Sequence, residues 1–134
     1  MRGLFGRLFG GRRPKSRAEL GRAAEEEAAR FLRSRGMEIL ARNVRYRDGE
    51  VDIVAREGGT LVFVEVKARR SEEFGSGAEA VTPRKRARII RAASRFLAGL
   101  GREADCRFDV VEVRLDNRGR PLGLRHVRGA FGEE

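Results

Sequence analysis

The sequence predicts an α/β fold in which two helices pack on one mixed β-sheet to form a sandwich. Apolar residues recur with helical spacing near the start of the chain and again in its second half. Three short runs of strand-forming residues, joined by glycine-containing turns, lie between these helices, and two more follow the second helix. Because tight turns join antiparallel strands and a helical crossover joins parallel ones, the sheet should contain both kinds of pairing.

The first helix is predicted over residues 18–35. One face carries its apolar side chains at intervals of one to four residues: Leu20, Ala24, Ala28, Phe31 and Leu32. Gly36 supplies a stop, because glycine readily adopts the left-handed conformation that ends many helices.

Three strands are predicted next, over residues 38–45, 50–57 and 60–68. Asp48-Gly49 joins the first strand to the second, and Gly58-Gly59 joins the second to the third. Both dipeptides are typical of tight hairpin turns. The three strands should therefore form an antiparallel meander.

The second helix is predicted to begin after Thr82, with Pro83 in its first turn, and to end near Leu100. Two further strands are expected over residues 107–115 and 122–127. The crossover through this helix should place the 107–115 strand parallel to a strand of the meander.

The chain of 134 residues is 40% hydrophobic, which suffices for one ordinary core. We expect a flexible basic arm over residues 1–17, one domain over residues 18–128 and a C-terminal tail over residues 129–134.

No apolar run approaches the length of a membrane helix, so we expect a cytoplasmic protein without a membrane partner. Cys106 is the only cysteine, which excludes an intrachain disulfide and a cysteine-built metal site.

The formal net charge of +10 indicates a polyanionic partner, for which nucleic acid is the first candidate. The 30 basic residues comprise 27 arginines and three lysines, which are Lys15, Lys67 and Lys85. Arginine is thus the default cation of this chain. A lysine within a strand is therefore less expected as an ordinary surface base, and its compact charge suits close approach to a water or a phosphate.

The stretch "LVFVEVKARR" places a carboxylate and an ammonium on one face of the third strand. Side chains alternate along a strand, so four of them share a face: Leu61, Phe63, Glu65 and Lys67. Hairpin pairing brings the second strand alongside, so Asp52 can lie close to Glu65. Two neighbouring carboxylates repel each other unless a cation or a proton lies between them.

Lys67 is one such cation, and a divalent metal is another. Oxygen ligands without histidine or cysteine suit Mg²⁺ or Mn²⁺. Asp52 and Glu65 would then bind the ion, and Lys67 would assist attack on a phosphodiester. The alternative is an ordinary cross-strand ion pair on a solvated face. Leu61 and Phe63 weigh against that alternative, because apolar residues on the same face imply that it is covered.

Three consecutive glutamates on the first helix could add a further carboxylate. At about 100° per residue, Glu25 lies beside the apolar stripe and Glu26 points away from it. The alternative is that all three glutamates only stabilise the helix near its N-terminus.

The second helix carries a row of basic side chains and no acidic residue. Its arginines recur at i, i+4, i+7 and i+11, at Arg84, Arg88, Arg91 and Arg95. A face that serves only solubility usually mixes both signs of charge. We expect these arginines, together with Lys85, to contact the phosphates of a nucleic acid.

Three stretches resemble the YraN family of bacterial proteins: "LGRAAEEEAARFL", "EILARNVRYRDGEVDIVAREGGTLVFVEVKARR" and "FGSGAEAVTPRKRARI". That family is similar to archaeal Holliday junction resolvases and has the restriction-endonuclease-like PD-(D/E)xK fold, a three-layer sandwich with an αβββαβ core. The resemblance implies that Glu25 is the helix acid, Asp52 the metal-binding aspartate, and Glu65 and Lys67 the ExK pair.

Two positions depart from the family pattern. Ala24 stands where the family usually has glycine before the helix acid, and Arg86 stands where it often has glutamine. Neither departure removes an expected metal ligand.

The resemblance implies a Mg²⁺- or Mn²⁺-dependent DNA endonuclease acting on branched DNA. A junction resolvase needs two active sites for two strands, so a homodimer is expected. The alternative is a nucleic-acid-binding module that retains the nuclease scaffold and does not cut. A structural protein on an acidic surface is a third reading, but it leaves the arrangement of Asp52, Glu65 and Lys67 unexplained.

Overall fold

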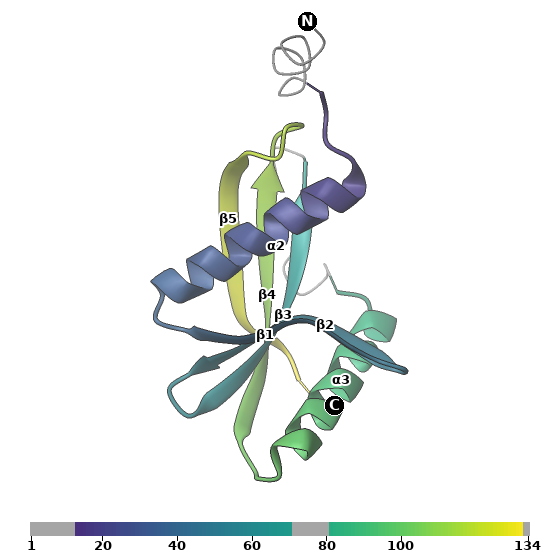
Figure 1. Cartoon of the computed structure of the whole chain (residues 1–134), viewed down its shortest axis with the longest axis vertical. Helices are drawn as coiled ribbons and strands as arrows, with labels where there is room; N and C mark the ends of the chain where they lie inside the picture. Colours follow the sequence, from purple (N-terminus) through teal and green to yellow (C-terminus); the bar gives the residue numbers. More distant parts are fainter. Residues whose placement is uncertain (1–12, 71–80, 133–134) are drawn as a thin grey trace, which may run out of the picture.

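The structure of the protein, a computed structural model, describes residues 13–70 and 81–132 (Figure 1). Most of the expected basic arm therefore lies outside the described residues, as does the end of the expected tail. Within the described residues the elements follow the predicted order: α2 (Arg17–Ser34), β1 (Glu38–Tyr46), β2 (Gly49–Glu57), β3 (Thr60–Arg69), α3 (Pro83–Leu100), β4 (Asp105–Leu115) and β5 (Pro121–Phe131).

The five strands form one mixed sheet in the order β1-β2-β3-β4-β5. The meander of β1, β2 and β3 is antiparallel, and β4 pairs in parallel with β3 from Thr60↔Asp105 to Arg69↔Arg114. Helix α2 packs on one face of the sheet and α3 on the other (Figure 1). The predicted fold class is confirmed, and this three-layer sandwich is compatible with a restriction-endonuclease-like fold.

Strand β3 supplies both halves of the core. Val62 and Val64 pack with the apolar face of α2, whereas Leu61 and Phe63 pack with α3. All four side chains are buried. The face of β3 that continues to Glu65 is therefore covered by a helix, as the sequence indicated.

Both helices begin at side-chain caps. In α2, the Ser16 hydroxyl accepts a hydrogen bond from the Glu19 N–H, and the Glu19 carboxylate accepts one from the Ser16 N–H. In α3, the Thr82 hydroxyl accepts a hydrogen bond from the Lys85 N–H at 3.2 Å. The second cap fixes the first turn of α3, which carries Lys85.

Two predicted boundaries require correction. Arg17 already belongs to α2, because Ser16 caps the helix. Strand β5 runs past the predicted end at residue 127, so residues 129–131 belong to the sheet and not to a tail. The cause is a stack of aromatic rings, in which the centroid of Phe131 lies 5.0 Å from that of Phe108 on β4.

Neither helix in the described part of the chain is long and apolar enough to cross a membrane.

Candidate active site

The β2 and β3 strands separate at the residues singled out in the sequence. Their ladder ends at the pair Ile53↔Val64, and the next residue on each strand is Asp52 or Glu65. Beyond this point β2 continues to pair with β1, whereas β3 continues to pair with β4. Asp52 and Glu65 therefore lie at a fork in the sheet.

The fork exists because the β1–β2 hairpin folds against α3. Gly49 approaches the backbone of α3 so closely that a Cβ atom there would overlap the Arg88 carbonyl oxygen. The Arg91 Nε donates to the Asp48 carbonyl at 2.7 Å, and Arg95 donates to both Asp48 carboxylate oxygens at 2.7 and 3.0 Å. These contacts draw the start of β2 away from β3.

Asp52 and Glu65 form a close pair of carboxyl groups at the fork. Glu65 is 3% exposed, and Asp52 Oδ2 accepts a hydrogen bond from the Val66 N–H at 2.8 Å. Burial and the neighbouring Glu65 carboxylate raise the pKa of Asp52 to about 7. The two groups therefore share negative charge that a proton or a cation must offset near neutral pH.

Lys85 is the cation that contacts this pair. Its Nζ lies 2.7 Å from Glu65 Oε1, and the Lys85 side chain is 40% exposed. Burial lowers the pKa of Lys85, but the hydrogen bond and the charge of Glu65 outweigh it, and the pKa lies above its ordinary value. The sequence placed Lys85 only on the nucleic-acid surface.

Lys67 lies further along the same face of β3, outside the lining of the cavity at Asp52 and Glu65. Its register partner on β4 is Glu112, which is fully buried and accepts hydrogen bonds from Arg69 at 3.2 Å and Arg125 at 2.6 Å. Among residues 13–70 and 81–132, Lys67 itself forms no ion pair. Lys85, and not Lys67, thus makes the contact with the carboxylate pair that the sequence predicted for Lys67.

Glu25 projects from α2 into the same cavity but is held apart from the pair. Its Oε1 accepts hydrogen bonds from Arg42 Nε at 3.1 Å and from Asn43 Nδ2 at 3.0 Å. In the described part of the chain no group of three histidine, cysteine or carboxylate side chains is close enough to hold a metal ion. The structure thus brings Asp52 and Glu65 together and leaves Glu25 as a neighbour.

A cavity of about 320 Å³ opens at the carboxylate pair. Helix α2, strands β1 to β3 and helix α3 all contribute to it, through Ala18, Gly21, Arg22, Glu25, Arg45, Asp52, Glu65, Val66 and Lys85. The fork explains how a helix on each face of the sheet can reach one cavity, because the sheet is open between β2 and β3.

The basic row on α3 divides into two parts. Arg91 and Arg95 are engaged with the hairpin turn at Asp48. Arg84 and Arg88 have no carboxylate partner among the described residues. Among the described residues, Arg95 is therefore the arginine of this row whose charge a carboxylate offsets, because Arg91 donates to the neutral backbone carbonyl of Asp48.

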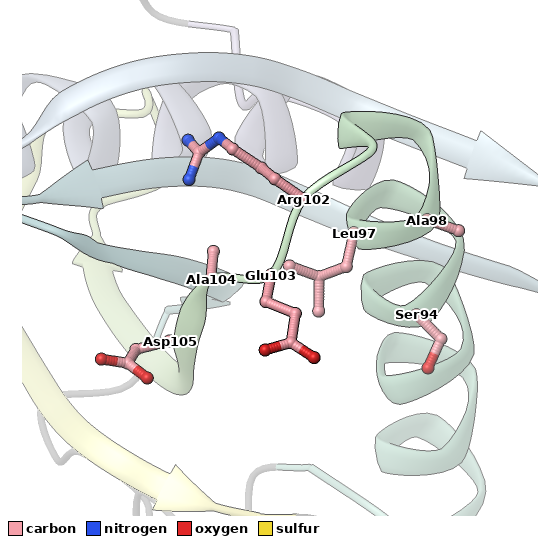
Figure 2. A pocket seen from close by; sticks show the side chains of 7 residues that line it. All are labelled: Ser94, Leu97, Ala98, Arg102, Glu103, Ala104 and Asp105. Atoms are coloured by element: carbon pink, nitrogen blue, oxygen red, sulfur yellow. The ribbon is translucent and has the colours of Figure 1, made fainter.

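A larger hollow, of about 510 Å³, lies at the opposite end of α3 (Figure 2). The side chains in Figure 2 come from the last turns of α3, from the loop that follows it and from the first residue of β4: Ser94, Leu97, Ala98, Arg102, Glu103, Ala104 and Asp105. It contains none of the predicted site residues, and its two carboxylates are exposed. Size alone therefore does not mark the candidate site.

Comparison with known proteins shows the family of this chain. Residues 24–113 match the family described as "Uncharacterised protein family UPF0102". The chain belongs to the UPF0102 family. This is the YraN family that the sequence resembled, and the matched segment contains the fork, the carboxylate pair and Lys85.

Curated UPF0102 proteins match most of the chain. The chain is 52% identical to a UPF0102 protein of Symbiobacterium thermophilum over 113 residues, which cover 84% of this chain and 95% of the relative. It is 54% identical to one of a Parafrankia species, with the same coverage. It is 49% identical over 126 residues to one of Ralstonia nicotianae, covering 90% of this chain and 92% of the relative.

Sequence reasoning missed two features of this UPF0102 site. One is the fork, since a hairpin turn predicts which strands pair but not where their ladder ends. The other is Lys85. A signal for it was present, because the rarity of lysine that singled out Lys67 applies equally to Lys85.

Proposed function

We propose that this protein is a divalent-metal-dependent endonuclease that hydrolyses phosphodiester bonds of DNA, with branched DNA as its substrate class. The observation that carries the proposal is the pair of adjacent carboxyl groups at an open fork, where burial and mutual repulsion raise the pKa of Asp52 to about 7. Such a pair costs folding free energy near neutral pH, and strongly perturbed groups of this kind cluster at functional sites.

The cavity has the donor chemistry for Mg²⁺ or Mn²⁺. Its lining offers carboxylate oxygens and contains neither histidine nor cysteine. Mg²⁺ commonly binds through one or two carboxylates and completes its coordination with waters and substrate phosphates, so Asp52 and Glu65 suffice as protein ligands. Glu25 is the nearest candidate for a third.

Each residue then has a distinct role. Asp52 and Glu65 hold the ion, which when bound supplies Lewis-acid polarisation of the scissile phosphate. The Val66 N–H orients the Asp52 carboxylate, and Lys85 orients Glu65. Lys67, on the same face of β3, offsets negative charge that develops on the phosphate.

The basic surface supplies affinity for DNA. Arg84 and Arg88 contact backbone phosphates beside the cavity, and Arg91 adds charge to the same row, whereas Asp48 offsets the charge of Arg95. Cutting both strands of a branched substrate requires two active sites, which a homodimer provides.

Two observations favour a second candidate function, a binding module that does not cut. Lys85 already compensates Glu65 at 2.7 Å, and no three-carboxylate group is present in the residues that the structure describes. Under this reading the pair is a partly buried ion pair within a DNA-binding scaffold.

The experiment that separates the two functions uses labelled four-way junction, duplex and single-stranded DNA with Mg²⁺, Mn²⁺ or EDTA. Purified wild type should cut the junction only when a divalent ion is present. Lys67→Ala should lower the cleavage rate by about 10²- to 10³-fold, the effect of removing one charge-stabilising group. Its bound fraction in EDTA should stay close to that of wild type, because one charge among many phosphate contacts is lost.

Lys15→Ala removes the same charge from the segment that precedes α2, rather than from the face of β3 that carries Glu65, and should retain cleavage. Binding by wild type without metal-dependent cutting of any of the three DNAs would exclude the endonuclease and support the binding module. Equal losses of binding and cleavage in Lys67→Ala would contradict a catalytic role for this lysine.

A further inference from the structure

The cavity at the carboxylate pair continues into a second hollow along α2. This second hollow, of about 420 Å³, lies between α2 and β1 and reaches Asn43. Arg22, Glu25 and Arg45 line both hollows. The two hollows therefore meet at these three residues, next to Asp52 and Glu65.

Most charged groups in the joined hollows compensate one another. Lys85 pairs with Glu65, and Arg42 pairs with both Glu25 and Glu26 at 3.1 and 2.9 Å. Arg22 and Arg45 differ, since neither has a carboxylate within ion-pair distance in the described residues, and both are exposed. They are thus the uncompensated cations where the hollows meet.

The wall around Arg22 leaves room for a ligand. Residues 18, 21, 22 and 25 have the i, i+3, i+4, i+7 spacing of one helix face, and the side chains beside Arg22 and Glu25 are the small Ala18 and Gly21. A Cβ added at Gly21 would meet no atom within 4 Å. The face of α2 toward the hollow is therefore open.

We propose that Arg22 and Arg45 form a phosphate-binding site that holds the backbone of a nucleic acid strand where the two hollows meet. Guanidinium groups bind phosphate oxygens through two parallel hydrogen bonds, which suits a fixed phosphate position. Arg22 comes from α2 and Arg45 from β1, so they can bind the nucleic acid backbone from two walls of the hollow. The identity of the strand as a cleavage substrate rests on the proposed function, whereas the binding site itself does not.

The test measures binding of a labelled four-way junction in EDTA as a function of salt concentration. The double variant Arg22→Ala/Arg45→Ala should bind more weakly, and the slope of log K against log salt should shrink by about 0.9 for each lost phosphate contact. The control Arg30→Ala/Arg33→Ala removes two charges of α2 that line neither hollow. It should leave most of that slope intact.

A second variant does not depend on removing an arginine. Gly21→Glu places a negative charge beside Arg22, in open space within a helix, and should weaken binding without loss of folding. Two results together would overturn the site: an equal fall of the slope in the double variant and in its control, and binding by Gly21→Glu as strong as that of wild type.

The outcome is separable from that of the proposed function. If wild type never cuts DNA, but the slope of log K against log salt is smaller in Arg22→Ala/Arg45→Ala as predicted, the protein has the phosphate site and is not a nuclease. If wild type cuts DNA, but the same double variant has the wild-type slope of log K against log salt, the protein is a nuclease without this phosphate site.

Discussion

Asp52→Asn should make the metal-free protein more stable at about pH 8 and should abolish metal-dependent cleavage. The folded state binds the Asp52 proton with a pKa of about 7, above the ordinary 3.8 of the unfolded chain. The stability that this bound proton contributes is fully present below the pKa of the unfolded state. It is lost as the pH rises through the pKa of the folded state. Asparagine avoids that loss, because its amide is neutral and its oxygen can still accept the Val66 hydrogen bond.

The difference between the folded and unfolded pKa values of Asp52 corresponds to about 4 kcal/mol, which is the upper bound of the gain in unfolding free energy in Asp52→Asn. Urea denaturation in EDTA at about pH 5 and about pH 8 measures it, and the gain should be larger at the higher pH. Asp48→Asn is the opposite control, because the hydrogen bonds from Arg95 lower the Asp48 pKa and their loss should destabilise the fold at the higher pH. A stability of Asp52→Asn equal to wild type at both pH values would contradict the raised pKa.

Gly49→Ala should be strongly destabilising. A Cβ at this position would overlap the Arg88 carbonyl oxygen and lie 2.8 Å from the Ala92 nitrogen, and both atoms belong to the backbone of α3. Neither can move without shifting the helix, so we expect a loss of about 1–3 kcal/mol in the free energy of unfolding. The displaced hairpin should also alter the fork, because Gly49 is the first residue of the strand that carries Asp52.

Gly21→Ala makes the same chemical change in open space within α2, and should stabilise the protein by about 0.5–1 kcal/mol through the lower entropy of the unfolded chain. Denaturant midpoints with unchanged m values compare the two variants. Similar midpoints for Gly49→Ala and wild type would show that the hairpin does not pack on α3 as closely as described.

The fold followed from local signals that each had a physical cause. Thr82-Pro83 predicted the start of α3, because a hydroxyl cap and a proline suit the first turn, and the structure confirms both. Asp48-Gly49 and Gly58-Gly59 predicted the two hairpins. Alternation along β3 predicted the faces of Leu61 and Phe63, since a strand has no other way to present its side chains.

The site was less predictable because its contacts join distant segments. Lys85 reaches Glu65 only because α3 packs across the fork, and spacing within α3 contains no information on that packing. Glu25 has the predicted position beside the apolar stripe, but Arg42 and Asn43 of β1 hold its carboxylate. The arginine row was recognised from its helical spacing, whereas the carboxylate that binds Arg95 lies in a hairpin turn far along the chain.

Manganese binding to the purified, metal-free protein tests the proposed metal site most directly. Calorimetric titration of wild type with Mn²⁺ should show saturable binding, and Asp52→Asn and Glu65→Gln should each lose most of it, because each removes one of the two proposed carboxylate ligands. The measurement requires neither DNA nor cleavage. Absence of saturable Mn²⁺ binding by wild type, or Mn²⁺ binding by both variants as strong as that of wild type, would contradict a metal site at the fork.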